Sequence, residues 1–140
     1  MFVKRILGLA FMLFLTTIAA SAQPPGTVNK TSIQGPDLIT DGIREMDLNN
    51  GKVEVAVKNI GSKPSVKSMV RLTVTPTDSL KTSSSKDVPA LQPNEIVWIP
   101  ISFKKPLNLA KYCVVADVLK QNAEMSEKNN EKCGEFSGKP

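Results

Sequence analysis

A strict alternation of apolar and polar residues in the stretch 51–76 is the feature that most constrains the fold of this chain. The alternating apolar positions in this stretch are Val53, Val55, Val57, Val70, Leu72 and Val74. A period of two places one set of side chains on a buried sheet face and the other set in water. We therefore predict a pair of half-buried antiparallel strands here, with the rest of the chain completing the same kind of sheet.

Further strands are predicted on both sides of this stretch, separated by corners rich in Pro, Gly and Asn. The other strand candidates are residues 36–47, with a kink at Gly42, and residues 95–104, 111–119 and 131–136, together with the polar segment 77–86, which is an edge strand or a crossing loop. The Asn50-Gly51 pair predicts that the first two strands are hairpin neighbours. With no helical period after the N-terminal segment, the pattern predicts an all-β, immunoglobulin-like seven-stranded β-sandwich.

The N-terminal segment has the features of a cleavable signal peptide. Lys4 and Arg5 precede an uncharged apolar run that is shorter than the ~20 residues needed to span a membrane. Ala20 and Ala22 then supply the small residues that signal peptidase requires, which predicts cleavage before Gln23. We expect an exported protein, periplasmic or secreted, with no stable membrane span in the mature chain.

These features predict three segments. Residues 1–22 form the signal peptide, residues 23–35 a flexible leader without periodicity, and residues 36–137 one β-sandwich domain. The two cysteines of the chain, Cys113 and Cys133, both lie in that domain. In an exported protein an even pair of cysteines predicts a disulfide, because the compartment is oxidising.

The composition excludes several classes of function. The chain contains no histidine, which removes Ser-His-Asp and Cys-His nucleophile systems and the common zinc sites. No glycine-rich phosphate loop is present, so we predict no catalytic residues and no enzyme activity. The net charge of +5 comes without a basic run that is interleaved with aromatic residues, so nucleic acid is not an expected partner.

One polar cluster near the C-terminus has two interpretations. Its members are Asp117, Glu124, Glu127, Asn129 and Asn130. Carboxylate and amide oxygens on one hairpin are the ligands that Ca²⁺ takes, so the cluster is a candidate calcium site and the one candidate cofactor site. Asn and Glu also hydrogen-bond turns readily, and we favour that second interpretation.

Several short motifs follow one another in an order that is typical of one family. They are Pro36-Asp37-Leu38, GKVEVAVKNIG at 51–61, VRLTV at 70–74, VPALQP at 88–93, Tyr112, Asp117 and EMSEKNN at 124–130. The series resembles a CARDB domain, the cell-adhesion-related module of bacterial exported proteins, over residues 36–136. The resemblance implies a seven-stranded sandwich, often one unit of a large surface protein, with binding or scaffold roles and no catalytic residues. This sequence differs in consisting of a single module with a predicted disulfide.

Three functions fit these observations. The first is an exported, non-catalytic binding or adhesion-type module that takes a protein or polysaccharide partner through its loops or through an exposed sheet edge. The second is an envelope scaffold without a ligand of its own. The third is a small inhibitor of an exported enzyme.

Overall fold

The computed structural model of the chain describes residues 34–78 and 80–138. The elements in chain order are β1 (Leu38–Asp47), the 3-10 helix η1 (Leu48–Asn50), β2 (Lys52–Asn59), β3 (Ser68–Thr75), β4 (Thr82–Val88), β5 (Ile96–Ser102), β6 (Lys111–Val115) and β7 (Glu131–Glu135). The predicted signal peptide, with Ala20, Ala22 and Gln23 at its cleavage site, lies outside the described residues. In the part of the chain that is described, no helix has the length and apolar character to cross a membrane.

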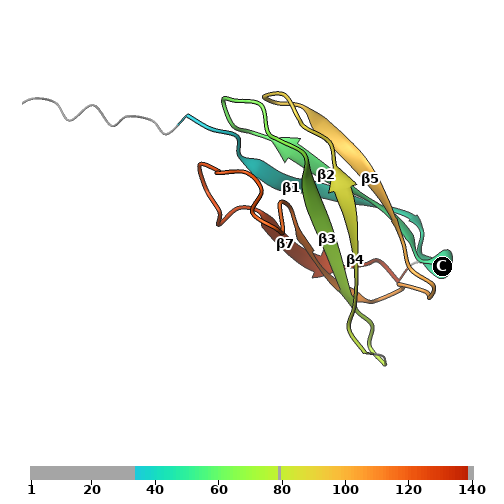
Figure 1. The fold of residues 1–140 in the computed structure, drawn as a ribbon. Helices are drawn as coiled ribbons and strands as arrows, with labels where there is room; N and C mark the ends of the chain where they lie inside the picture. The colour runs from blue at the N-terminus through green and yellow to red at the C-terminus, as the bar shows by residue number, and fades with distance from the viewer. Residues whose placement is uncertain (1–33, 79, 139–140) are drawn as a thin grey trace, which may run out of the picture. The chain divides into compact units, whose positions relative to one another are not determined.

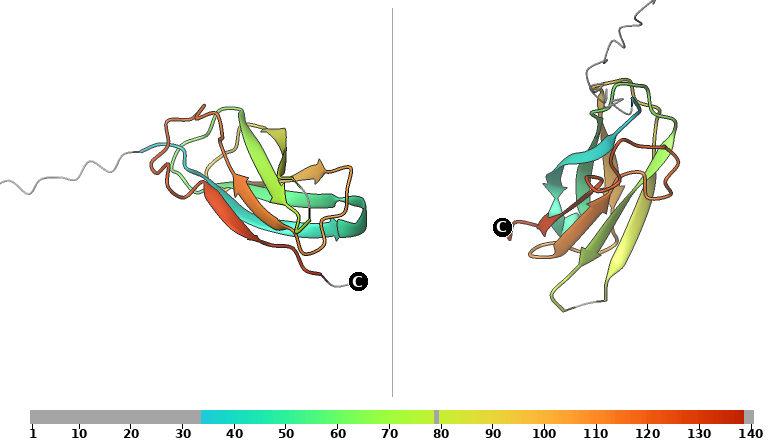
Figure 2. Two further views of the ribbon diagram at one scale, coloured as in Figure 1. Left: turned by 90° about the horizontal axis from the view of Figure 1, so that it is seen from below. Right: turned by 90° about the vertical axis from the view of Figure 1, so that its left-hand side faces the viewer.

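The strands form two antiparallel sheets that pack face to face (Figure 1). One sheet has three strands in the order β1-β2-β5, and the other has four strands in the order β4-β3-β6-β7. Figure 2 shows the same two layers from two further directions. This arrangement confirms the prediction of an all-β, seven-stranded sandwich.

The two alternating strands of residues 51–76 do not pair with each other, so that part of the prediction was wrong. β2 lies at the centre of the three-stranded sheet, and β3 lies inside the four-stranded sheet. The connection 60–67 crosses from one sheet to the other, so the two apolar sets meet across the core. Alternation shows which face of a strand is buried, but it does not show which strand is its hydrogen-bonded neighbour.

The first hairpin is closed by a turn that differs from the expected Asn-Gly turn. The Asp47 carboxylate accepts hydrogen bonds from the backbone N–H of Asn50 (3.2 Å) and from its side chain (2.7 Å), which lowers the pKa of Asp47. Of the turn residues only Gly51 has a positive φ, 66°. A β-carbon at Gly51 would lie 2.5 Å from the carbonyl oxygen of Phe103, so glycine is required there. β1 and β2 are hairpin neighbours, as predicted.

The core lies between the two sheets and consists mainly of Val, Leu and Ile from their inner faces. β2 contributes Val53, Val55 and Val57, and β3 contributes Val70, Leu72 and Val74, all at most 1% exposed. From residues 97–103, Ile99, Ile101 and Phe103 belong to the core and Val97 packs against it. Each such side chain stabilises the fold by about 1.5–3 kcal/mol relative to its exposed state.

β6 is shorter than predicted, because the strand ends at Val115 and not at residue 119. Asp117 was expected within this strand but adopts a positive φ of 43°, which a strand cannot contain. The rest of the strand pairs with β7, where Cys113 and Cys133 are direct partners. Their sulfur atoms are bonded at 2.00 Å, so the structure contains the predicted disulfide.

Reduction of this disulfide, or replacement of both cysteines by Ser, should lower the free energy of unfolding by about 3 kcal/mol. The two cysteines are 20 residues apart in sequence, and the bond restricts the loop between them in the unfolded chain. Denaturant titration of the oxidised and reduced protein measures the difference. A loss below about 1 kcal/mol would contradict this account of the disulfide.

Candidate functional site

The loops at one end of the sandwich lie side by side and form the candidate site. The β2–β3 loop (60–67), the β4–β5 loop (89–95) and the β6–β7 loop (116–130) gather where the chain enters β1 at residues 35–37 (Figures 1 and 2). We call this group of segments the loop end. Loops that a rigid scaffold positions are where proteins commonly carry their binding residues.

The side chain of Asn59, the last residue of β2, holds three of these segments together. Its Oδ1 accepts hydrogen bonds from the backbone N–H groups of Asp37 (3.1 Å) and Gly61 (3.0 Å). Its Nδ2 donates to the carbonyl oxygens of Lys63 (2.8 Å) and Leu91 (3.0 Å). Asn59 is 0% exposed, and these bonds use both hydrogens of its amide nitrogen and both acceptor positions of its oxygen.

Backbone hydrogen bonds add to the contacts of Asn59. The carbonyl oxygen of Gly35 accepts from the N–H groups of Ser62 (2.9 Å) and Lys63 (3.3 Å). Ser65 N–H donates to the carbonyl oxygen of Leu91, and Leu91 N–H donates to Ser65 Oγ, both at 2.9 Å. The β2–β3 loop is therefore tied to the start of β1 on one side and to the β4–β5 loop on the other.

Asp117 organises the β6–β7 loop from its left-handed position. Its two carboxylate oxygens accept from the backbone N–H groups of Gln121 (2.9 Å) and Asn122 (2.7 Å). The Asn122 side-chain oxygen in turn accepts from the N–H of Val66 at 2.8 Å. This chain of contacts connects the β6–β7 loop to the β2–β3 loop, and both Asp117 and Asn122 are buried.

Glu124 connects the same loop to β1. Its Oε1 accepts from the backbone N–H of Leu38 (2.9 Å), and its Oε2 accepts from Asn130 Nδ2 (2.5 Å). Burial raises the pKa of Glu124 to about 7, although both hydrogen bonds act in the opposite direction. The negative charges of Asp117 and Glu127 contribute to this raised pKa. A half-buried carboxyl thus bridges two segments that are 86 positions apart in sequence.

The five candidate calcium ligands have separate contacts. Glu127 is exposed and pairs with Lys120 at an N–O distance of 3.7 Å. Asn129 donates to the carboxylate of Asp37 at 3.0 Å, while Asp117 is engaged with its own turn. Hydrogen bonds and an ion pair therefore account for the contacts of these residues, and the calcium site stays a prediction.

Some of the five do lie together. Asp117, Glu127 and Asn130 line a hollow of about 330 Å³ beside the β6–β7 loop. The side-chain oxygens of Asn129 and Asn130 are buried and accept no hydrogen bond from the residues that the structure describes. Among the described residues, one group of three Cys or acidic side chains brings its ligand atoms within 4.8 Å of one another, and it consists of the disulfide cysteines Cys113 and Cys133 with Glu131. None of the five candidate calcium ligands belongs to this group.

Sequence reasoning missed three residues that connect the loop end, namely Asp37, Asn59 and Asn122. Each of them resembles an ordinary turn or corner residue in the sequence, because the hydrogen bonds that connect it to another segment span 22 or more positions. Asp37 and Asn59 do stand inside the Pro-Asp-Leu and GKVEVAVKNIG motifs that carry the family resemblance. Those motifs are the sequence signal that could have pointed to Asp37 and Asn59. No motif or local pattern points to Asn122.

Large apolar side chains are exposed at the loop end. Ile60 and Val66 of the β2–β3 loop are 44% and 56% exposed, and Leu119 and Met125 of the β6–β7 loop are 56% and 44% exposed. The backbone near these side chains is hydrogen-bonded to other segments. The N–H of Ile60 donates to the carbonyl oxygen of Asp37, and the N–H of Met125 donates to the carbonyl oxygen of Pro36. The loop end therefore presents apolar groups on loops that are tied in place.

The chain's single tryptophan does not form an open aromatic surface. Trp98 lies on the outer face of β5, and the guanidinium of Arg44 from β1 sits 4.0 Å from the centre of its ring. Arg44 is itself held by Glu54 of β2 at 3.0 Å. A cation over the ring face is a stabilising contact within the sheet.

The raised pKa of Glu124 predicts that the protein loses stability as the pH rises from about 4.5 to about 7. The folded chain binds this proton more tightly than the unfolded chain does, so the stabilisation is complete at low pH and disappears toward the folded pKa. Because Glu124 is only half-buried, solvent weakens the effect, and we expect a loss of about 1 kcal/mol. Unfolding curves between pH 4.5 and 8 measure it.

The variant Glu124→Gln removes the titrating group and should flatten this part of the pH profile. Glu135→Gln, a change in an exposed carboxylate of β7 that is not among the charges raising the pKa of Glu124, is the matched control and should keep the wild-type profile. An unchanged pH dependence in Glu124→Gln would show that the titration of Glu124 is not linked to folding.

The sequence model of the CARDB family matches residues 35–133. A crystal structure of the CARDB domain of a Pyrococcus furiosus protein, solved in complex with di-metal ions, has a TM-score of 0.56 and 22% identity, covering 76% of this chain and 96% of that chain. A crystal structure of Bifidobacterium adolescentis GH3 β-glucosidase has a TM-score of 0.41 and 14% identity over 72% of this chain and 17% of that chain. Comparison with curated protein sequences found no match.

The family match and the fold agree with the motifs that run through the chain. The matched range contains β1 to β6 and begins just before Pro36-Asp37-Leu38. The Pyrococcus furiosus domain shares the fold over nearly its whole length. The resemblance inferred from the sequence is confirmed, and the chain belongs to the CARDB family.

Proposed function

We propose that this protein is an exported adhesion-type module that binds a protein partner through its loop end. Membership of the CARDB family suggests a non-catalytic adhesion-type role. The predicted signal peptide supports export, and the absence of histidine from the chain argues against the common catalytic systems.

The observation that carries the proposal is the combination of tied loops and exposed apolar side chains at one end of the sandwich. Ile60, Val66, Leu119 and Met125 are each 44–56% exposed there. Exposed apolar side chains on the loops at one end of a sandwich offer a surface that another protein can cover. Because the loops already share hydrogen bonds, binding orders few further groups and loses little conformational entropy.

A protein partner fits the loop end better than a polysaccharide does. Sugar rings are commonly recognised by open aromatic ring faces, and the described aromatic residues offer few of these. Trp98 lies under Arg44, and the ring of Tyr112 packs against that of Phe136 with centroids 4.7 Å apart. Phe103 and Phe136 are buried in the core.

Replacing Leu119 and Met125 by Ser should reduce capture of the partner on the order of tenfold, since two side chains at the centre of an apolar contact contribute about 1–2 kcal/mol or more. The measurement is affinity capture from the native envelope fraction, followed by binding of the purified partner. The matched control replaces Leu109 and Met46 by Ser. These residues are 55% and 56% exposed and lie outside the loop end.

A partner retained by the wild type and by the control variant, but not by the loop-end variant, supports the proposal. Equal loss in both variants, or the absence of any reproducible partner, would favour the scaffold function instead. A captured exported enzyme whose activity falls on binding would identify an inhibitor. Repeating the capture with Ca²⁺ and with a chelator tests the calcium prediction in the same preparation.

A further inference from the structure

Four strands lie at the edges of the two sheets, and three of them carry features that hinder the addition of another strand. The pairing of β1 with β2 shifts register at two places. β5 contains Pro100, which has no N–H to donate, and β7 is only five residues long. Such bulges, prolines and short lengths are the means by which proteins block sheet edges.

β4 lacks these protections. It has seven residues, contains no proline, and pairs with β3 in one continuous register. No residue of β4 makes a described backbone hydrogen bond outside that ladder, so its second edge is unpaired. The side chains of Thr82, Ser83, Ser84 and Ser85 are small, which leaves the backbone of this edge accessible.

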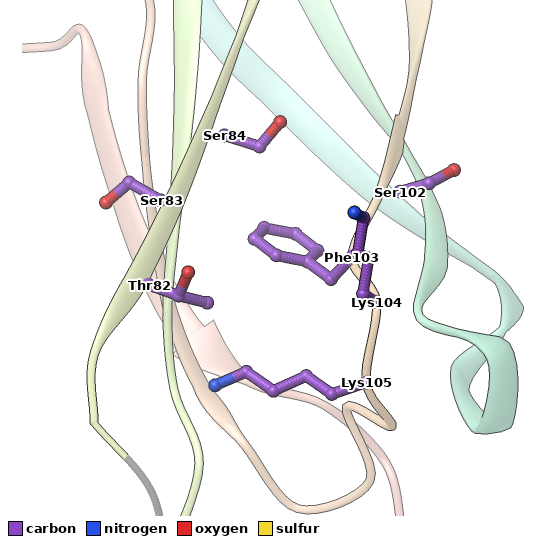
Figure 3. Close-up of a pocket in the computed structure, with 7 residues that line it drawn as sticks. All are labelled: Thr82, Ser83, Ser84, Ser102, Phe103, Lys104 and Lys105. Carbon is purple, nitrogen blue, oxygen red and sulfur yellow. The ribbon is translucent and has the colours of Figure 1, made fainter.

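A groove of about 390 Å³ runs beside β4, between it and residues 102–105 (Figure 3). Thr82, Ser84, Phe103 and Lys105 point into this groove, whereas Ser83 points away from it. The Lys105 ammonium donates to the carbonyl oxygen of Leu80 at 3.3 Å and has no carboxylate partner among the described residues. The groove is therefore lined by hydroxyl groups, an aromatic ring and positive charge.

The charged side chains that line the groove are all positive. Lys104 and Lys105 line the groove, and no carboxylate lines it. Lys81 directly precedes β4, and Lys86 lies within β4. None of these lysines is in an ion pair in the part of the chain that the structure describes. The acidic residue of β4, Asp87, is engaged with Lys67 at 2.8 Å.

We infer that the free edge of β4 is a docking edge for an extended acidic segment of a partner protein. The segment would add to the four-stranded sheet as a further strand, with its main chain paired to β4 and its carboxylates toward the lysines. A second copy of this chain is disfavoured, because two β4 edges would bring lysines together. This surface is separate from the loop end, so the inference does not depend on the proposed function.

The probe for this inference is a short fluorescent peptide of alternating glutamate and valine, with binding followed by anisotropy. Two further peptides carry N-methyl groups on the odd or on the even residues, because methylation removes the N–H groups of one peptide edge at a time. One methylated peptide should bind on the order of tenfold or more weakly than the parent, and the other should bind almost as well as the parent. Amide exchange in β4 should slow when the parent peptide binds.

Charge reversal tests the role of the lysines. The double variant Lys86→Glu with Lys105→Glu should bind the glutamate peptide about tenfold more weakly and should gain affinity for a lysine-valine peptide. Lys132→Glu on the edge strand β7 is the matched control and should leave both affinities unchanged. The methylated peptides test the inference with the wild-type protein even where the double variant does not fold.

Three results would overturn the inference. One is equal binding of both methylated peptides, which would mean that the main chain does not pair. Another is binding of a polyuronate chain without binding of the glutamate peptide, which would identify an anionic polysaccharide site. The third is unchanged amide exchange in β4 at saturating peptide.

Discussion

The hydrogen bonds of the buried Asn59 side chain are the interaction on which the arrangement of the loop end depends. They reach the entry to β1, the β2–β3 loop and the β4–β5 loop from one point at the end of a central strand. A buried amide with all its positions used is stabilising, whereas each partner left without a bond costs about 1–3 kcal/mol. Asn59 therefore holds these segments in place relative to one another. The β6–β7 loop is connected to the β2–β3 loop through Asn122 and to β1 through Glu124.

The two proposed surfaces use opposite physical properties of the same sandwich. At the loop end, loops that are connected by hydrogen bonds expose apolar side chains such as Leu119 and Met125. At β4, the backbone groups of the free edge remain unpaired and basic side chains surround them. A module with two separate surfaces can connect two partners, which is consistent with an adhesion-type family.

Much of the fold could be predicted from the sequence, because a period of two reports burial directly. The buried faces of β2 and β3, the polar character of β4 and the disulfide between Cys113 and Cys133 followed from alternation, composition and compartment. The separation of β2 and β3 into different sheets could not be predicted in this way, since strand pairing depends on long-range packing. The connections of Asn59 and Asp117 were missed for the same reason: Asn59 contacts residues far away in sequence, and the positive φ of Asp117 ends a strand whose alternation continues.

Amide hydrogen exchange at Asp37 and Gly61 tests the central claim most directly. Both N–H groups donate to Asn59 Oδ1, and neither belongs to a strand. If Asn59 fixes the loop end, these two amides are protected to an extent similar to the amides of β2, and they exchange mainly when the sandwich opens. Exchange at the rate of unprotected loop amides, with β2 still protected, would show that the loops move independently and would contradict the account.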